Sequence, residues 1–502
     1  MVDPSIIRSI VDNRASLPFI LPAVIIAGAL LVVLIAGLLA KRRRYWLHLI
    51  ATQGICLALY ATIRLGSQPS VQAGIPLFNH LIKLDPWAIF FHVLLMSITL
   101  CILLIPNQEN QHDPDLDATA VYVVMILSTL LATYFLAMAN HWLIIYLSLA
   151  LMTLSSAVLV YSHLQSQGAV ASLKYILYSA VGAAIMLWGM SYLYGITATL
   201  GLAEPGAMYG LQATPSPILL IGLFLALSGI LMKLGIFPFH FWIADVYQGA
   251  SMTVVAYLAT VPKLAAVAVM VRLCKQLIPQ LSVASNHLQS FIALIAILTI
   301  VIGHVAALAQ SHPKRVLAYG SIAQGGLLMA GVGTCTDSYA SIAYYSMIYS
   351  IMGLAAWVGL RILRTITDSE RMQDYAGLGR RFPVLGICLV IAMLSLIGLP
   401  PTAGFTGKLL IFSTLLEAAQ AIDNPLLAIL LVLSVLGSVI SLYYYLKLPC
   451  ALFFKPRQQQ ALISSIPLIE QLVLMLLAVV LLGLFFGANM LVEILQKWSI
   501  IP

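Results

Sequence analysis

The sequence contains very little charge. Only 8% of its 502 residues are Asp, Glu, Lys or Arg, and 62% are hydrophobic, whereas soluble domains have about 25% charged and roughly 45–50% apolar residues. This composition excludes a water-soluble globule and places the chain in a lipid bilayer. The apolar runs are continuous, which excludes a membrane β-barrel with its alternating strands. The excess of 25 Lys and Arg over 17 Asp and Glu indicates membrane orientation rather than a nucleic-acid surface.

Cysteines with the spacing of a metal site or a disulfide framework are also absent. The six cysteines are scattered and lie mostly inside apolar runs: Cys56, Cys101, Cys274, Cys335, Cys388 and Cys450. The sequence has no Walker loop, no dinucleotide-binding fingerprint and no haem or cluster motif. We therefore expect no metal site and no cofactor in this chain, and a source of energy outside it.

Fourteen apolar runs are long enough to span a bilayer. They lie at residues 18–40, 46–65, 87–105, 118–138, 141–161, 170–195, 216–236, 252–274, 288–310, 315–333, 338–363, 383–418, 425–448 and 465–488. We predict an all-α integral membrane protein with about 14 transmembrane helices. The first run is interpreted as an uncleaved helix rather than a signal peptide.

Lys and Arg concentrate in the loops on one side of this predicted topology. That side carries residues 41–44, 314–315, the Arg361 to Arg381 segment, Lys447, Lys455 and Arg457. The other side carries only scattered cations, such as Arg64, Lys83 and Lys275. The positive-inside rule then places both termini outside the cytoplasm.

Two of the predicted helices contain Gly and Pro breaks. The seventh is interrupted at about 235–238 and the twelfth at 398–404. Their positions predict two inverted five-helix repeats, the fourth to eighth and the ninth to thirteenth helices. Gly and Pro are common in membrane helices, so either break alone is weak evidence. The predicted segments are 1–117 with three helices, 118–276 and 277–450 with the repeats, and 451–502 with the last helix.

Three lysines lie inside predicted spans. Lys233 precedes the first break, Lys263 lies in the middle of the next helix, and Lys408 follows the second break. Burial disfavours the charged form of an amine, so a buried lysine can exchange protons at cellular pH. Lysines near span ends, such as Lys174 and Lys447, more simply extend their ammonium groups to the headgroups. We predict that the first three form a proton relay.

Histidine is the other proton carrier suited to neutral pH. His240 follows the first break and His304 lies inside the ninth predicted helix. For each of the two histidines, two interpretations are equally favoured: a proton carrier of the relay, or a residue that only makes structural hydrogen bonds. Three weaker candidates for holding waters between the carriers are Tyr257, Tyr319 and Gln324, because hydroxyls in membrane helices commonly bond only to backbone carbonyls.

Several long motifs resemble a known family. The segments 229–250, 258–263 and 309–322 resemble the antiporter-like subunits of respiratory complex I. The segment 398–408 is most similar to subunit N, because Lys408 stands where subunit M usually has a glutamate. Subunit L usually has a long lateral helix, and nothing after residue 488 is long enough to form one. The resemblance covers the fourth to thirteenth helices well.

The resemblance implies a proton-translocating membrane-arm subunit of an NADH:quinone oxidoreductase. Lys233, Lys263 and Lys408 then match the family's central relay lysines, and His240 matches a histidine beside the broken helix. FMN, iron–sulfur clusters and quinone are expected in partner subunits, which makes this chain a non-redox subunit. The implied partners are other membrane-arm subunits, including a sister antiporter-like subunit. The implied location is a bacterial inner (plasma) membrane, with a thylakoid membrane as the alternative.

One position departs from the family's pattern. Ala150 stands where the fifth helix of the family carries a glutamate that pairs with the lysine of the seventh. No Asp or Glu occurs between Asp117 and Glu204, so no nearby acid replaces it. A carboxylate within about 4–6 Å favours a protonated lysine. Lys233 therefore either exchanges protons without a switching ion pair, or this half of the subunit has weakened or lost pumping. Gln324, where many members have histidine, is a milder departure.

The spans as a whole are expected to hold a handful of buried cations and almost no buried anion.

Two other functions stay open. One is a subunit of a multi-subunit cation/proton antiporter, which shares the broken-helix lysine motifs, and the other is the membrane arm of a hydrogenase-type complex. Lys408 favours the NADH:quinone oxidoreductase, and the copurifying partners would decide between the three.

Overall fold

The computed structural model describes residues 13–39, 44–105, 116–161, 166–202, 210–212, 215–281, 284–334, 339–421, 424–456 and 467–499. Within these residues, thirteen helices are long and apolar enough to cross a membrane. A fourteenth span is reached if Met372–Arg381 and Pro383–Ile397, which are bent by 120°, count as one. The prediction of an all-α membrane protein with about 14 spans is confirmed.

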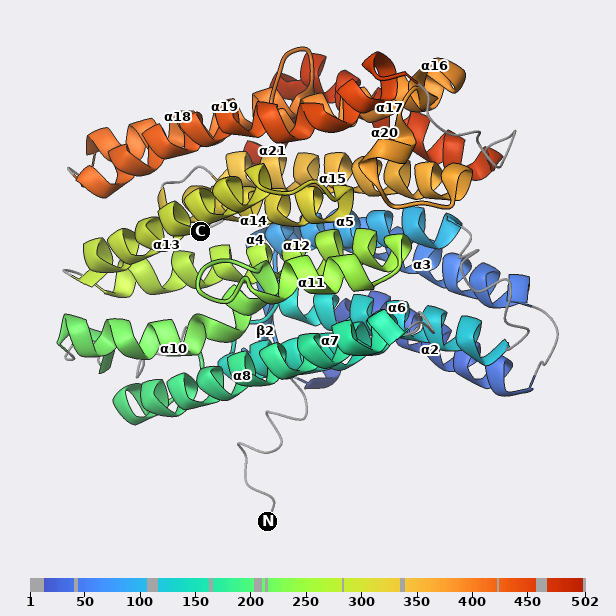
Figure 1. Cartoon of the computed structure of the whole chain (residues 1–502). Helices are drawn as coiled ribbons and strands as arrows, with labels where there is room; N and C mark the ends of the chain where they lie inside the picture. The colour runs from blue at the N-terminus through green and yellow to red at the C-terminus, as the bar shows by residue number, and fades with distance from the viewer. Residues whose placement is uncertain are drawn as a thin grey trace. The chain divides into compact units, whose positions relative to one another are not determined.

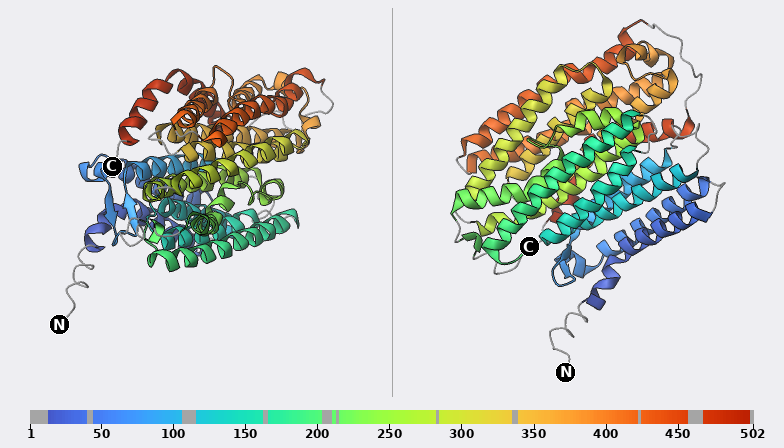
Figure 2. Two further views of the ribbon diagram at one scale, coloured as in Figure 1. Left: turned by 90° about the vertical axis from the view of Figure 1, so that its left-hand side faces the viewer. Right: turned by 60° about the horizontal axis from the view of Figure 1, so that its bottom comes forward.

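The chain divides into two compact units. Unit 1 contains Met1–Lys233, Val261–Leu288 and Trp498–Pro502, and unit 2 contains Leu234–Thr260 and Gln289–Lys497. Neighbouring helices within each unit lie side by side with similar axis directions (Figure 1). Two further views show the same packing within each unit (Figure 2).

The elements up to the first break are mostly long helices. They are η1 (Leu17–Ile20), α2 (Leu21–Leu39), α3 (Arg44–Gly66), α4 (Pro69–Ala73), β1 (Ile75–Leu77), β2 (Ile82–Leu84), α5 (Pro86–Leu104), α6 (Leu116–Ala137), α7 (Trp142–Tyr161), α8 (Ser166–Thr197) and α10 (Ser216–Leu234). The strands β1 and β2 pair antiparallel as a short hairpin.

The elements after the first break are again helical. They are α11 (Trp242–Gly249), α12 (Met252–Leu277), η3 (Ile278–Gln280), α13 (Ala284–Leu308), α14 (Pro313–Thr334), α15 (Tyr339–Thr367), η4 (Met372–Tyr375), α16 (Leu378–Arg381), α17 (Pro383–Ile397), α18 (Ala403–Ala421), α19 (Pro425–Phe454), α20 (Leu468–Phe486) and α21 (Ala488–Ser499).

Large apolar side chains cover the outer faces of many helices. Trp188 on α8 is 68% exposed and Val479 on α20 is 65% exposed. In water such a surface would be strongly unfavourable, whereas in a bilayer it faces lipid tails. The exposed apolar faces therefore agree with the low charge of the sequence.

The first predicted break separates α10 from α11. Gly235 follows α10 with a φ of +66°, a left-handed conformation that favours glycine. A Cβ at this position would lie 1.9 Å from Ile243 Cδ1, so a larger residue would have to displace the Ile243 side chain as well as adopt this backbone conformation. The backbone N–H of Phe237, which no helix partner satisfies, donates to Thr299 Oγ1 at 3.0 Å. The segment after the break contains the short helix α11.

The second predicted break separates α17 from α18. Gly398 follows α17 with a φ of +85°, and α18 begins at Ala403. A left-handed glycine at this position is a common end for a helix. The backbone carbonyls of the last turn of α17 then have no donor within their own helix.

An ion pair joins the start of α5 to α12 in unit 1. Asp85 caps α5 by accepting from the Ala88 N–H at 2.9 Å, and its two oxygens each accept from Arg272 at 2.8 Å. Burial by itself raises the pKa of Asp85, but the charge and hydrogen bonds of Arg272 outweigh it and hold the pKa below its usual value.

Candidate functional site

Lys233 is buried in unit 1 against a tyrosine. Its Nζ donates to Tyr175 Oη at 2.7 Å and lies 4.6 Å from the centre of the same ring. Lys233 is 3% exposed and Tyr175 is 1% exposed. Within the described residues Lys233 makes no ion pair. The lysine predicted to lack a carboxylate partner is thus held by a neutral hydroxyl group.

Glycines on α8 bring this tyrosine close to α10. A Cβ on Gly189 would lie 2.1 Å from the backbone N of Ala226, and one on Gly182 would lie 3.2 Å from Met232 Cβ. Ser228 also donates to the Gly182 carbonyl at 2.9 Å. Tyr175, Gly182 and Gly189 follow one another at intervals of seven residues, so they share one face of α8. This face packs along α10 and ends with Tyr175 at Lys233.

Ala150 lies partly exposed on α7. The side chain of its neighbour Leu149 comes within 3.4 Å of the place where a Cβ of Gly229 would lie. This turn of α7 therefore packs against α10 one helical turn before Lys233. The described parts of α6, α7 and α8 place no acidic side chain at Lys233.

Lys263 is the second buried lysine of unit 1. It is 1% exposed and lies directly after Pro262, which is inside α12. The structure therefore buries this lysine within its helix, as the sequence predicts.

Lys408 lies in unit 2 and contacts the end of α17. Its Nζ donates to the carbonyl oxygens of Leu396 and Ile397 at 3.0 and 2.7 Å, and it reaches Ser438 Oγ at 3.4 Å. The side chain is buried, with the residue 4% exposed. The two carbonyls belong to the last turn of α17, where helical carbonyls lack donors and attract a cation. Lys408 thus donates hydrogen bonds to carbonyl groups that the break leaves without a partner in their own helix.

Gln324 and His304 lie in the same region of unit 2. The Gln324 amide donates to the Leu396 carbonyl at 3.0 Å, which is also an acceptor of Lys408, and its oxygen accepts from Tyr345. His304 Nδ1 is 3.0 Å from Tyr444 Oη. A Cβ on Gly437 would lie 2.5 Å from His304 Nε2, so this glycine makes room for the ring beside the Ser438 that Lys408 contacts. The structure brings these three predicted residues together.

Three predicted residues do not belong to the set around Lys408. His240 lies beside two aromatic rings, 6.1 Å from the Phe237 ring centre and 4.3 Å from that of Phe241. Its Nδ1 is buried without a hydrogen-bond partner in the described part of the chain. Tyr257 is fully buried in α12, and Tyr319 is partly exposed on α14. The roles predicted for these residues stay predictions.

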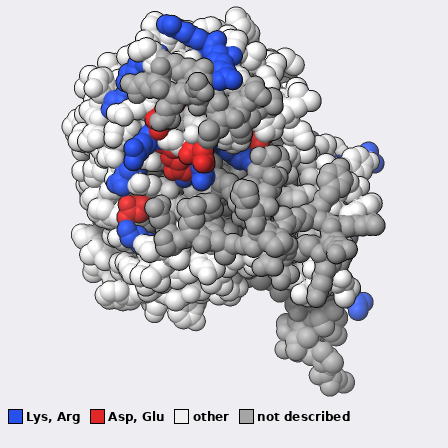
Figure 3. All heavy atoms as spheres, turned by 45° about the vertical axis from the view of Figure 1, so that its right-hand side comes forward, with Lys and Arg blue, Asp and Glu red and all other residues white. Residues whose placement is uncertain are grey.

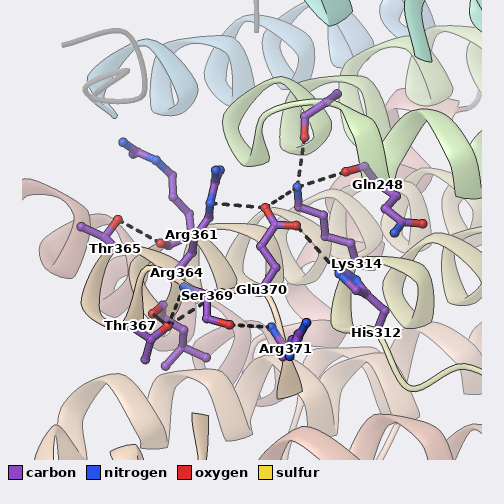
Figure 4. A network of polar contacts seen from close by, with 12 residues as sticks. Gln248, His312, Lys314, Arg361, Arg364, Thr365, Thr367, Ser369, Glu370 and Arg371 are labelled. Atoms are coloured by element: carbon purple, nitrogen blue, oxygen red, sulfur yellow. Dashed lines mark hydrogen bonds and ion pairs between the residues drawn. The ribbon is translucent and has the colours of Figure 1, made fainter. Parts of the chain in front are cut away.

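A charged network that the sequence did not indicate lies between the start of α14 and the end of α15 (Figure 4). Glu370 accepts from Lys314 at 2.7 Å and from Arg364 at 3.3 Å, and His312 lies 3.9 Å away. Lys314 also donates to the Gln248 carbonyl at 3.3 Å. Acidic side chains lie beside basic ones on the face seen in Figure 3. Of the residues considered above, 41–43, Arg457 and Cys335 lie outside the described residues.

The expectation of a handful of buried cations and almost no buried anion agrees with the described residues, where two acids are buried against six lysines and arginines. Glu470 on α20 is 0% exposed and lies 3.1 Å from Arg361 on α15, and Asp85 is buried as well. Each buried acid is neutralised by an arginine, which offsets the cost of removing its charge from water. The sequence feature that could have identified Glu470 is that it is the only acid of the apolar run 465–488. Tyr175 had no comparable signal, because nothing in the sequence separates it from the other tyrosines.

Within the described residues, no group of three or more His, Cys, Asp or Glu lies close enough to hold a metal ion. Taken together, the spans, the two broken helices and the buried lysines define a polytopic helical membrane protein with ionisable groups inside the bilayer. Such groups mark ion or proton pathways.

Comparison with known proteins agrees with this class. The family model for the transmembrane proteins of NADH:quinone oxidoreductase and the Mrp antiporter matches residues 139–441. NADH-quinone oxidoreductase subunit N of Chlorobium chlorochromatii is 30% identical over 500 residues, which cover 96% of this chain and 95% of that protein. The chain belongs to this NADH:quinone oxidoreductase and Mrp antiporter family.

Solved structures show the same fold. A chain of respiratory complex I from Thermus thermophilus matches with a TM-score of 0.79 and 28% identity, covering 95% of this chain and 100% of that one. A chain of the Mrp complex from Dietzia sp. matches with a TM-score of 0.79 at 18% identity, covering 95% and 96%. The predicted resemblance to the antiporter-like subunits is confirmed.

Proposed function

We propose that this chain is a proton-translocating membrane-arm subunit of an NADH:quinone oxidoreductase, in which Lys233, Lys263 and Lys408 carry protons. The observation that carries the proposal is that lysines at both helix breaks are buried and held by neutral oxygens. Lys233 is bonded to one phenol oxygen, and Lys408 to two carbonyls and a serine. A permanent carboxylate partner would hold the proton more firmly, whereas neutral acceptors allow exchange.

In unit 2, His304 and Gln324 extend the proposed relay around Lys408. His304 can carry a proton, because histidine has both a protonated and a neutral form near physiological pH. Gln324 can only orient neighbouring groups, since an amide does not change its charge. His240, Tyr257 and Tyr319 enter the proposal as further carriers or water-holding groups. The segments 118–276 and 277–450 are proposed to be inverted repeats.

The redox chemistry belongs to other subunits in this proposal. The relative from Chlorobium chlorochromatii is named as a subunit of an NADH-quinone oxidoreductase, and the matching Thermus thermophilus chain belongs to respiratory complex I. FMN, iron–sulfur clusters and quinone are assigned to partner subunits, and a sister antiporter-like subunit is an expected neighbour. The proposed location is a bacterial inner membrane, with both termini on the non-cytoplasmic side.

Copurification tests the assembly. An affinity tag on the chain in its native membranes is expected to recover flavin and iron–sulfur absorbance together with NADH oxidation by quinone. Recovery of small hydrophobic exchanger subunits without flavin would instead establish a cation/proton antiporter. Recovery of a hydrogenase-type or other reductase without flavin-dependent NADH oxidation would establish the third alternative.

The Ala150 departure has its own test. We propose that Lys233 exchanges protons without a switching ion pair, so the wild type and Ala150→Glu are expected to translocate the same number of protons per NADH in membrane vesicles. The alternative is a subunit whose first half has weakened or lost pumping. It requires a low ratio in the wild type that Ala150→Glu raises, because the new carboxylate supplies the missing partner.

A further inference from the structure

Tyr175 is the hydrogen-bonding partner that Lys233 has in this structure. The two side chains come from α8 and α10 and meet inside unit 1, with the amine 2.7 Å from the phenol oxygen. Ser156 and Ser179 lie close to the same oxygen. Since α6, α7 and α8 supply no carboxylate in their described residues, the phenol is the polar group that determines where the lysine amine lies.

A phenol can keep this bond whatever the charge of the lysine. A charged ammonium group can only donate, and a phenol oxygen accepts from it. A neutral amine has a lone pair, and the phenol O–H can turn and donate to it. The bond therefore reverses its direction without breaking any covalent bond of the phenol. An ionised carboxylate can only accept, so it lacks this property.

We propose that Tyr175 is a positioning residue that holds the Lys233 amine in place in both of its protonation states. This inference rests on the proposed role of Lys233 as a proton carrier. It explains how the chain can function without an acid at position 150. The Tyr175 hydroxyl group from α8 forms the hydrogen bond to the amine, and this hydroxyl group does not need to gain or lose charge when the lysine does.

The packing of α8 on α10 makes this position firm. The glycines at 182 and 189 let the two helices approach so closely that backbone atoms would meet a Cβ at 189. Because Tyr175 lies on the same face, its ring has little freedom to move away from Lys233. The ring also lies under the amine at 4.6 Å, and a cation is attracted to an aromatic face at this distance.

The test is Tyr175→Phe in the assembled complex, which removes the hydroxyl group and keeps the ring. The matched control is Tyr178→Phe, because Tyr178 is exposed on the same helix. Proton translocation in membrane vesicles is measured per assembled complex, quantified by its flavin content. We expect Tyr175→Phe to lower the rate about fivefold, the size of one lost hydrogen bond. Tyr178→Phe should equal the wild type.

A double-mutant cycle with Lys233→Met separates positioning from folding. If Tyr175 acts through Lys233, Tyr175→Phe causes no further loss in the Lys233→Met background. If Tyr175→Phe lowers the translocation rate by the same factor in both backgrounds, Tyr175 has a structural role and the inference is overturned. A Tyr175→Phe rate equal to wild type, with Lys233→Met impaired, would also overturn it and leave the proposed function standing. A Lys233→Met variant with wild-type translocation would remove the proposed function itself, and the inference with it.

Discussion

The two broken helices place their lysines in different surroundings. At the first break, Lys233 has one phenol as its hydrogen-bond partner, and its place depends on close packing between α8 and α10. At the second break, Lys408 bonds to two carbonyl oxygens at the end of α17 and approaches a serine. The first lysine is positioned by a side chain, and the second by the backbone that the break itself exposes.

This difference shows that a lysine next to a break can be held without a carboxylate in two ways. A helix C-terminus presents unpaired carbonyls and a partial negative charge, so it attracts an ammonium group. A phenol carries no charge and can either donate or accept. The carbonyl groups around Lys408 therefore favour the charged form of its amine more than the phenol favours that of Lys233, although in the described part of the chain neither site contains a carboxylate that would fix the proton.

The strongest way to test the second site is Lys408→Met. Removal of the amine deletes the proton carrier, and we expect coupled proton translocation to fall on the order of 100-fold, as for the loss of an acid–base group. Lys447→Met is the matched control, since Lys447 also donates to two backbone carbonyls, those of Leu308 and Gln310, at 3.1 Å each. Equal losses in the two variants would mean that Lys408 only stabilises a helix end.

The dependence of the first site on helix packing is tested by Gly189→Ala. The new Cβ would lie 2.1 Å from a backbone nitrogen of α10, and the helices must separate. Overpacking of this kind costs about 2 kcal/mol, so the thermal midpoint of the purified complex should fall and translocation should decrease. Gly195→Ala on the same helix meets nothing within 4 Å and should leave the midpoint unchanged. A midpoint unaffected by Gly189→Ala would contradict the packing argument.

A smaller effect is expected from Gly437→Ala at the second site. Here the Cβ would meet the tip of the His304 ring, at 2.5 Å from Nε2, and a side chain can turn where a backbone cannot. We expect a loss of about 1 kcal/mol in stability and a measurable reduction in translocation. The control is Gly483→Ala, whose Cβ has no neighbour within 4 Å. A larger loss of stability in Gly437→Ala than in Gly189→Ala would contradict the expectation that a clash with backbone atoms costs more than a clash with a side chain.

Much of the fold followed from local patterns. The apolar runs predict the spans, because a helix needs about 20 such residues to cross a bilayer. Gly235 and Gly398 mark both breaks, since each adopts a positive φ. The burial of Lys233, Lys263 and Lys408 was predictable as well, because each lies inside an apolar run.

The partners of these lysines were not predictable in the same way. Tyr175 is 58 residues away from Lys233, and only the packing of α8 on α10 brings them together. The carbonyl acceptors of Lys408 carry no sequence signal, because every residue has a carbonyl group. The pairing of the buried Glu470 was not predictable either, because its partner Arg361 lies on another helix. Pairing between distant residues is a property of tertiary structure, which composition does not reveal.

We propose that Lys233 carries protons although it has no acidic partner among the described residues. The most direct test is the number of protons translocated per NADH oxidised in membrane vesicles, compared between the wild type and Lys233→Met at equal content of assembled complex. We expect a lower ratio in Lys233→Met, together with NADH oxidation that continues when the proton gradient is collapsed. An unchanged ratio in Lys233→Met would contradict it.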